Sequence, residues 1–99
     1  MHEFPVGIHV LVRGRVQGVG FRYFVKQAAD ALGVAGWVRN LHDGRVEAVL
    51  VGPEAEVQAA LDQLVRGPRN ARVDEVATRP ASLEESGAAM RPLLLRETR

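Results

Sequence analysis

The stretch IHVLVRGRVQGVGFRYFVKQAADAL, residues 8–32, contains a change of hydrophobic period that decides the fold. Over residues 8–13 the apolar side chains alternate along the chain, which predicts a half-buried β-strand. From residue 21 they recur at helical spacing, which predicts an amphipathic helix that ends at Gly33. Residues 14–20, with three glycines, would form the loop between the two. The apolar faces would carry Ile8, Val10 and Val12 on the strand, and Phe21, Phe24, Val25, Ala28 and Leu32 on the helix.

The second predicted helix, over 53–66, has the clearest boundaries in the sequence. Pro53 suits a first helical turn, and Gly67 followed by a proline stops the helix. Further strands are predicted over 37–39, 45–51 and 72–79, from their short apolar alternation.

The connections and the C-terminal stretch complete this outline. Residues 41–44 form a hairpin turn whose Asp43-Gly44 pair would supply the positive-φ positions. Residues 81–89 are predicted as a loop. Residues 90–96 would form a short fifth strand, which Pro92 confines to a sheet edge.

The order of elements is strand, helix, strand, strand, helix, strand. This order predicts an α+β fold, the ferredoxin-like βαββαβ sandwich, with an antiparallel sheet and two helices on one face. Ninety-nine residues are enough for one core, so we expect a single domain over residues 1–99.

Composition excludes several classes of protein. The chain has no cysteine, which rules out disulfides, thiolate zinc sites and a cysteine nucleophile. A net charge of +1 argues against a general nucleic-acid binder. The apolar stretches are too short to span a bilayer, and residues 1–5 lack the features of a secretory signal. We therefore expect a cytoplasmic protein, and a monomer because the helices show no surplus apolar stripe.

The loop 14–20 and the start of the first helix could bind an anion. Glycines allow several backbone N–H groups to converge, and a helix N-terminus favours negative charge. No Ser, Thr, Asp or Asn is present to cap this helix, and Arg22 lies in its first turn, where a cation is unfavourable. A phosphate in the gap would account for both features. The alternative is a tight turn with an incidental exposed arginine, and the glycines fit no common nucleotide motif.

Asn40 closes the second strand, close to where the loop 14–20 could approach. It is either a turn-forming residue or an amide that holds a water molecule. The three histidines lack metal-ligand spacing, so no metal site is predicted. We expect His9 on the surface or on a sheet face, Glu84 and Glu85 as solvated loop charges, and Trp37 in the core.

Two motifs resemble those of a known family, the acylphosphatases. The first is VRGRVQGVGFR at 12–22, which resembles the phosphate loop of that family. The second is GWVRN at 36–40, followed by GRV at 44–46 and by Gly52, which resembles its hairpin. The resemblance covers roughly residues 8–80. The C-terminal stretch departs from it, because RPLLL at 91–95 has no aromatic residue.

The resemblance implies a site and a reaction. Arg22 would bind the phosphate and Asn40 would position the attacking water. The backbone amides of the loop would cradle the phosphate; they belong to Arg15, Val16, Gln17, Gly18, Val19 and Gly20. The family hydrolyses acyl phosphates, which are carboxyl-phosphate anhydrides, to a carboxylate and inorganic phosphate. It needs no metal or other cofactor.

Two other functions fit the same fold. Some ferredoxin-like domains bind RNA by stacking bases on aromatic residues of two strands, but residues 8–13 and 45–51 contain none. The chain could also be a regulatory or degenerate acylphosphatase-like domain, as occurs within larger carbamoyl-transfer proteins. A chain of 99 residues without a linker-like tail favours a free-standing enzyme.

Overall fold

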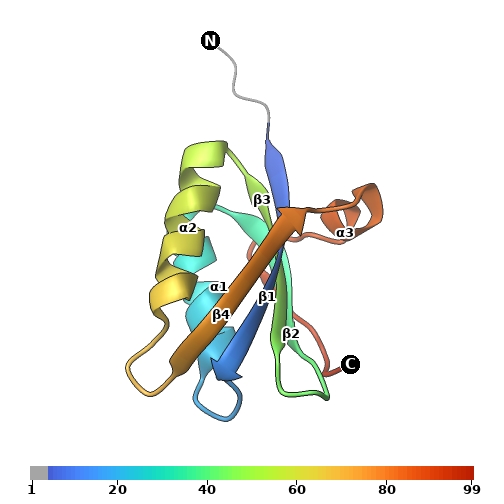
Figure 1. The fold of residues 1–99 in the computed structure, drawn as a ribbon. Coiled ribbons are helices and arrows are strands. Elements are labelled where there is room, and N and C mark those ends of the chain that lie inside the picture. Colours follow the sequence, from blue (N-terminus) through green and yellow to red (C-terminus); the bar gives the residue numbers. More distant parts are fainter. Residues whose placement is uncertain (1–4) are drawn as a thin grey trace.

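The computed structural model describes residues 5–99, which form one sheet, two long helices and one short helix (Figure 1). The elements are β1 (Val6–Arg15), α1 (Phe21–Leu32), β2 (Ala35–Asn40), β3 (Val46–Gly52), α2 (Glu54–Arg66), β4 (Arg72–Pro80), α3 (Leu83–Gly87) and β5 (Leu94–Leu95). Residues 1–4, which belong to the stretch predicted to lack a secretory signal, lie outside the described residues. Within residues 5–99, no helix is long and apolar enough to cross a membrane.

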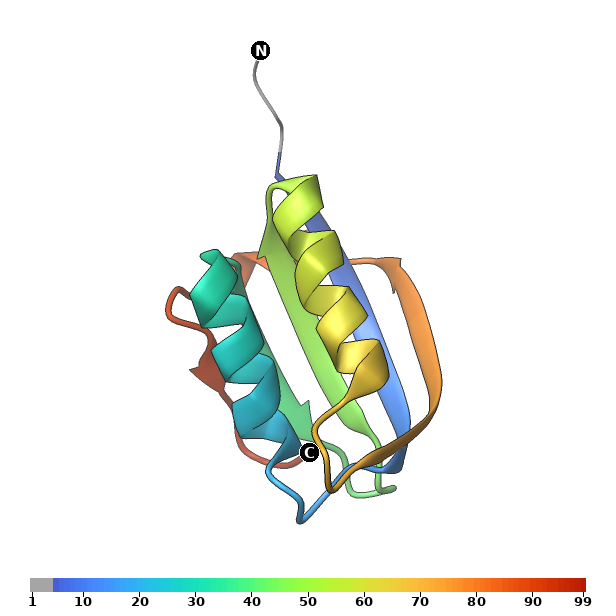
Figure 2. The same ribbon diagram turned by 90° about the vertical axis from the view of Figure 1, so that its left-hand side faces the viewer.

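The strand order in the sheet is β4-β1-β3-β2-β5. β1 lies between β3 and β4 and is antiparallel to both, and β2 is antiparallel to β3. α1 and α2 lie side by side over one face of this sheet (Figure 2). The predicted α+β fold with two helices on one face is therefore confirmed.

The core lies between the sheet and these two helices. Alternate residues of the strands point toward it, so Val10 and Leu50 are fully buried while their neighbours face the other way. Val25 of α1 and Leu64 of α2 are buried against them. The alternation in β1 and the helical stripe in α1 were the features that predicted this packing.

The first loop is shorter than predicted, because β1 continues through Gly14 to Arg15. The register to β4 shifts between Arg13 and Gly14, which marks a β-bulge. Gly14 has a φ of 142°, and a Cβ added there would lie 2.0 Å from the carbonyl oxygen of Arg72. Gly14 is thus required by strand pairing and not by the loop.

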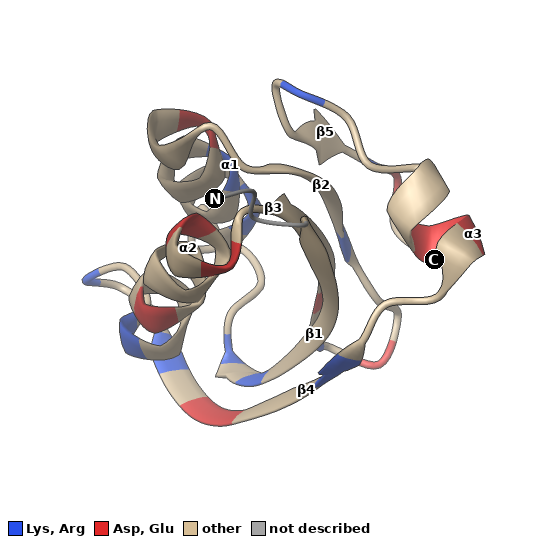
Figure 3. Cartoon of the chain, turned by 90° about the horizontal axis from the view of Figure 1, so that it is seen from above, with Lys and Arg blue, Asp and Glu red and all other residues tan. Residues whose placement is uncertain are grey.

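The prediction of a loop over 81–89 was wrong, because this stretch contains α3. Ser82 caps the helix by accepting a hydrogen bond from the Glu85 N–H, and the Glu85 carboxylate accepts one from the Ser82 N–H. This capping box was visible in the sequence as a serine followed three residues later by a glutamate. Figure 3 shows that α3 lies on the other side of the sheet from α1 and α2.

Two smaller expectations also needed correction. In the hairpin turn Gly44 has a positive φ, of 98°. Among residues 5–99 no residue other than glycine has a positive φ, so Asp43 does not share that role. The predicted fifth strand over 90–96 is reduced to Leu94–Leu95, which pairs in parallel with β2 at the sheet edge. Met90 makes only an isolated bridge with Gly36.

Candidate active site

A small pocket of about 140 Å³ lies where the loop after β1, the start of α1 and the end of β2 meet. Its walls come from residues far apart in the sequence, which the sheet order brings together. The lining residues are Val16, Gly18, Gly20, Phe21, Arg22, Tyr23 and Asn40. Both residues predicted to carry the chemistry, Arg22 and Asn40, are among them.

The loop that forms one wall depends on two glycines. Gly18 and Gly20 have φ values of 73° and 78°, in the left-handed region. A Cβ added at either position would meet no atom within 4 Å, so space does not restrict these positions. The requirement is conformational, because a side chain in this region costs about 1–2 kcal/mol.

The N-terminus of α1 opens into the same region without a side-chain cap. Gly20 is the N-cap residue, it makes no side-chain hydrogen bond, and the first turn holds no acidic residue. Helical hydrogen bonding begins at the Phe24 N–H, which donates to the Gly20 carbonyl at 3.0 Å. The N–H groups before it have no helical acceptor and carry the positive end of the helix dipole. The prediction of an uncapped helix start is confirmed.

Arg22 lies in this first turn and is half-buried. Its Nη1 donates a hydrogen bond to the Arg96 carbonyl oxygen at 3.3 Å. One end of the guanidinium is therefore held by the C-terminal segment, while the side chain lines the pocket. No acidic side chain lines the pocket with it.

Gln17 fastens the loop to the hairpin between β2 and β3. Its Nε2 donates to the Leu41 carbonyl at 2.7 Å and to the Arg45 carbonyl at 2.9 Å. These contacts span 24 and 28 residues of sequence. Sequence reasoning placed only the backbone amide of Gln17 in the site, and its side chain turns out to join the two halves.

Asn40 is the last residue of β2 and is half-buried. Its backbone pairs with Val46, and its carbonyl accepts a hydrogen bond from the Arg99 N–H at 3.0 Å. These two contacts fix the backbone from both sides of the strand. Asn40 lines the pocket, and the hydrogen bonds of Gln17 show that the loop after β1 and the hairpin after β2 approach each other, as expected.

The remaining predicted loop residues do not line this pocket. Arg15 pairs with Arg72 at the end of β1, the Gln17 side chain bonds to the hairpin, and Val19 packs against the core. Two lining residues, Phe21 and Tyr23, were not predicted for the site. Their position beside Arg22 in the sequence was the available signal.

A second group of polar residues lies on the face of the sheet opposite α1 and α2. His9 is buried there, and its Nε2 lies 2.7 Å from the Glu47 carboxylate. It therefore lies on a sheet face, which was one of the two positions expected for it. Burial alone would raise the pKa of Glu47, but hydrogen bonds with His9 and Arg39 bring it below its ordinary value. Among residues 5–99 no group of three His, Asp or Glu side chains is placed to hold a metal ion.

Glu85 is not the solvated loop charge that was expected. Its carboxylate pairs with both terminal nitrogens of Arg79, at 2.8 and 2.7 Å. This pairing and the hydrogen bond from the Ser82 N–H lower the pKa of Glu85 to about 2. Trp37 is buried as predicted, but on this face and outside the main core.

Comparisons with known proteins indicate one family. A family model described as Acylphosphatase matches residues 8–88. A protein of Moorella thermoacetica named Acylphosphatase is 59% identical over 71 residues, which are 72% of this chain and 76% of that protein. An acylphosphatase structure from Coxiella burnetii is 35% identical, with a TM-score of 0.82 over 93% of both chains. HypF of T. kodakarensis is 32% identical, with a TM-score of 0.77 over 94% of this chain and 12% of that one. The chain therefore belongs to the acylphosphatase family, enzymes that hydrolyse acyl phosphates.

Proposed function

We propose that the pocket between the β1–α1 loop and β2 hydrolyses acyl phosphates by direct attack of water on phosphorus. Arg22 and the backbone amides of residues 15–20 would bind the phosphate, and Asn40 would hold the water. The products are a carboxylate and inorganic phosphate. The observation that carries the proposal is that one small pocket is lined by both Arg22 and Asn40.

The phosphate end of the pocket suits a doubly charged group. The uncapped N–H groups of α1 and the guanidinium of Arg22 all favour negative charge. In phosphoryl transfer the transition state spreads charge over three equatorial oxygens. Donors that are already fixed stabilise this charge without reorganising during the reaction. The Arg22–Arg96 hydrogen bond supports this fixed position.

The chemical step needs little acid or base catalysis, because a carboxylate is a good leaving group. The water oxygen forms a bond to phosphorus while the bond from phosphorus to the acyl oxygen breaks. The acyl oxygen leaves as carboxylate, and the water's proton passes to a phosphate oxygen. The amide of Asn40 would accept a hydrogen bond from the water or donate one to it. Its contribution is to position the water in line with the breaking bond.

The decisive test is hydrolysis of acetyl phosphate in excess chelator, since the proposed step uses no metal or cofactor. We expect turnover in chelator and its loss in Arg22→Ala. Asn40→Ala should lose most of its turnover, while its residual activity is inhibited by inorganic phosphate, and the protein binds phosphate, nearly as well as in wild type. Weaker phosphate inhibition in Asn40→Ala would make Asn40 a binding residue, and full turnover in Arg22→Ala would overturn the proposal.

The setting of the enzyme is proposed with it. We expect residues 1–99 to act as one domain, as a cytoplasmic monomer that binds no nucleic acid. Sedimentation should give the mass of one chain, and a single cooperative unfolding transition should be observed. A gel shift with RNA at physiological salt would contradict this expectation.

A further inference from the structure

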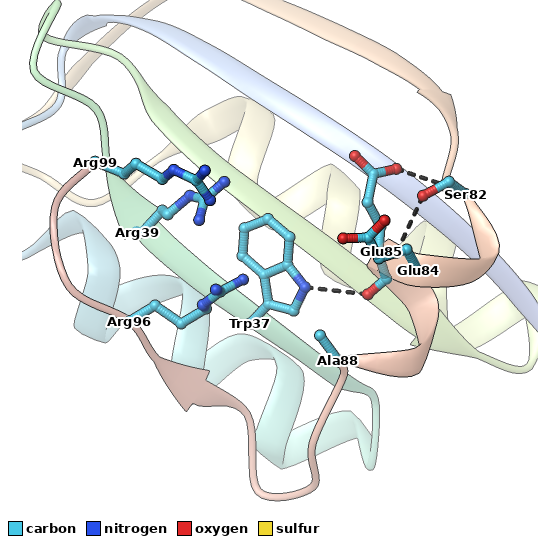
Figure 4. A pocket seen from close by; sticks show the side chains of 8 residues that line it. All are labelled: Trp37, Arg39, Ser82, Glu84, Glu85, Ala88, Arg96 and Arg99. Carbon is cyan, nitrogen blue, oxygen red and sulfur yellow. Dashed lines mark hydrogen bonds between the residues drawn. The ribbon is translucent and has the colours of Figure 1, made fainter.

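A second pocket, of about 320 Å³, lies on the face of the sheet opposite α1 and α2 (Figure 4). Its volume falls in the range of sites for small molecules. It lies between β2, α3 and the C-terminal segment, and the proposed reaction does not use it. The lining residues are Trp37, Arg39, Ser82, Glu84, Glu85, Ala88, Arg96 and Arg99.

One end of this pocket carries an excess of positive charge. The side chains of Arg39, Arg96 and Arg99 lie together there, away from the two glutamates (Figure 4). Arg39 is paired with Glu47 at 2.6 Å. Within residues 5–99 no carboxylate lies within ion-pair distance of the other two guanidinium groups. Three like charges thus share one counter-charge.

Two of these guanidinium groups are held in place before any ligand arrives. Arg39 and Arg96 each lie 4.8 Å from the centroid of the Trp37 ring. They are therefore no farther apart than twice that distance. Trp37 is 2% exposed, and its Nε1 donates to the Glu85 carbonyl at 3.1 Å, so the ring itself is fixed. A guanidinium stacked on a ring keeps the N–H donors at its edge free for an anion.

The backbone that carries Arg96 and Arg99 is also anchored. The Arg96 N–H donates to the Val38 carbonyl at 2.8 Å, and the Arg99 N–H donates to the Asn40 carbonyl at 3.0 Å. The C-terminal segment therefore runs along β2 beyond β5. Binding at this end would order side chains only, which lowers its entropic cost.

The acidic end of the pocket sets the orientation of a ligand. Glu85 is neutralised by Arg79 through two hydrogen bonds. Glu84 is exposed and makes no ion pair among the described residues. Its charge would repel an anion that reached across the pocket, so the negative groups of a ligand belong at the arginine end.

We propose that this pocket is a second anion-binding site, for a small, multiply charged anion whose phosphate or carboxylate groups contact Arg39, Arg96 and Arg99. The planar donor pattern of arginine suits both groups. The site shares no lining residue with the phosphate pocket, and the proposal stands independently of the proposed reaction.

The test uses Trp37, the only tryptophan of the chain, as a reporter inside the pocket. Pyrophosphate and citrate are titrated separately, at constant ionic strength, into the full chain carrying Arg22→Gln. This background removes the proposed phosphate ligand of the other site. We expect a saturable fluorescence change and a one-site calorimetric isotherm with at least one of the two anions. The tighter anion identifies whether the site prefers phosphate or carboxylate groups.

Charge variants show whether the arginines carry the binding. We expect Arg96→Gln and Arg99→Gln each to weaken binding by about tenfold. Arg69→Gln removes the same charge from an exposed position outside the pocket and should bind as the background chain does. Arg96→Gln could fail to fold because the stacking on Trp37 is lost. In that case Arg99→Gln, at an exposed position, provides the test of binding.

Two results would overturn the proposal. One is the absence of saturable binding for both anions. The other is equal binding by Arg99→Gln and Arg69→Gln. Neither result bears on acetyl phosphate turnover, so the failure of this site and the failure of the proposed function can be distinguished.

Discussion

Replacing Gln17 by alanine should separate the two halves of the phosphate pocket. The side-chain amide of Gln17 joins the β1–α1 loop to the carbonyl groups of Leu41 and Arg45. Leu41 follows Asn40 directly in the sequence, so these bonds fix Asn40 relative to the loop. Alanine keeps the backbone of the loop and removes only this connection.

The size of the effect follows from the two hydrogen bonds. Each contributes about 1 kcal/mol, so the free energy of unfolding should fall by about 2 kcal/mol. A misplacement of about 1 Å in a positioning group can cost about 100-fold in rate, so we expect kcat to fall by about 10- to 100-fold. Phosphate affinity should change little, because Arg22 and the start of α1 are untouched.

The assay combines acetyl phosphate kinetics, inhibition by inorganic phosphate and urea unfolding. Gln27→Ala is the matched control, since Gln27 is exposed on α1 and its side chain makes no hydrogen bond within residues 5–99. It should keep both kcat and stability. A Gln17→Ala protein that is less stable but turns over at the wild-type rate would refute the reasoning, because the bond would then support the fold alone.

Three further substitutions test other parts of the structure. Gly14→Ala places a Cβ 2.0 Å from the Arg72 carbonyl oxygen, so urea unfolding should show a loss of more than about 2 kcal/mol; an unchanged midpoint would contradict the bulge. Gly18→Ala should cost about 1 kcal/mol, because its φ is 73°, and should weaken phosphate inhibition; unchanged inhibition would separate this loop from phosphate binding. Glu85→Gln tests the pair with Arg79. The folded-state pKa of Glu85, about 2, lies below the ordinary 4.5, so the ionised carboxylate stabilises the fold above pH 4.5 and this contribution is lost toward pH 2. Wild type should therefore unfold at higher temperature than Glu85→Gln at pH 7, and the difference should vanish near pH 2; a constant difference would refute the assignment.

The sequence predicted the features that depend on near neighbours along the chain. The alternation over 8–13 and the helical stripe over 21–32 are local patterns, and they placed β1 and α1 correctly. The absence of a side-chain cap at Gly20 could also be predicted, because it depends on residue types within one turn. These patterns, together with the two family motifs, located the pocket.

Contacts between distant segments could not be predicted in the same way. The sequence around Gln17 contains no pattern that predicts the contacts of its amide with Leu41 and Arg45. The acceptors are backbone carbonyls, which every residue possesses. The bulge at Gly14 likewise depends on where β4 pairs. The capping box at Ser82 is a different case, since its pattern was present in the sequence and was overlooked among loop residues.

The hydrogen bonds of the C-terminal segment have a consequence for the order of folding. Arg22 reaches across 74 positions of sequence to Arg96, and Asn40 is contacted by Arg99. Closing such long loops is entropically expensive, so these contacts form after the local ones. A chain still being synthesised can therefore complete the β1–α1–β2–β3 part of the pocket before the Arg22 side chain and the Asn40 backbone are held by the C-terminal segment. Activity at the proposed site would therefore follow the docking of residues 96–99 on β2 and α1.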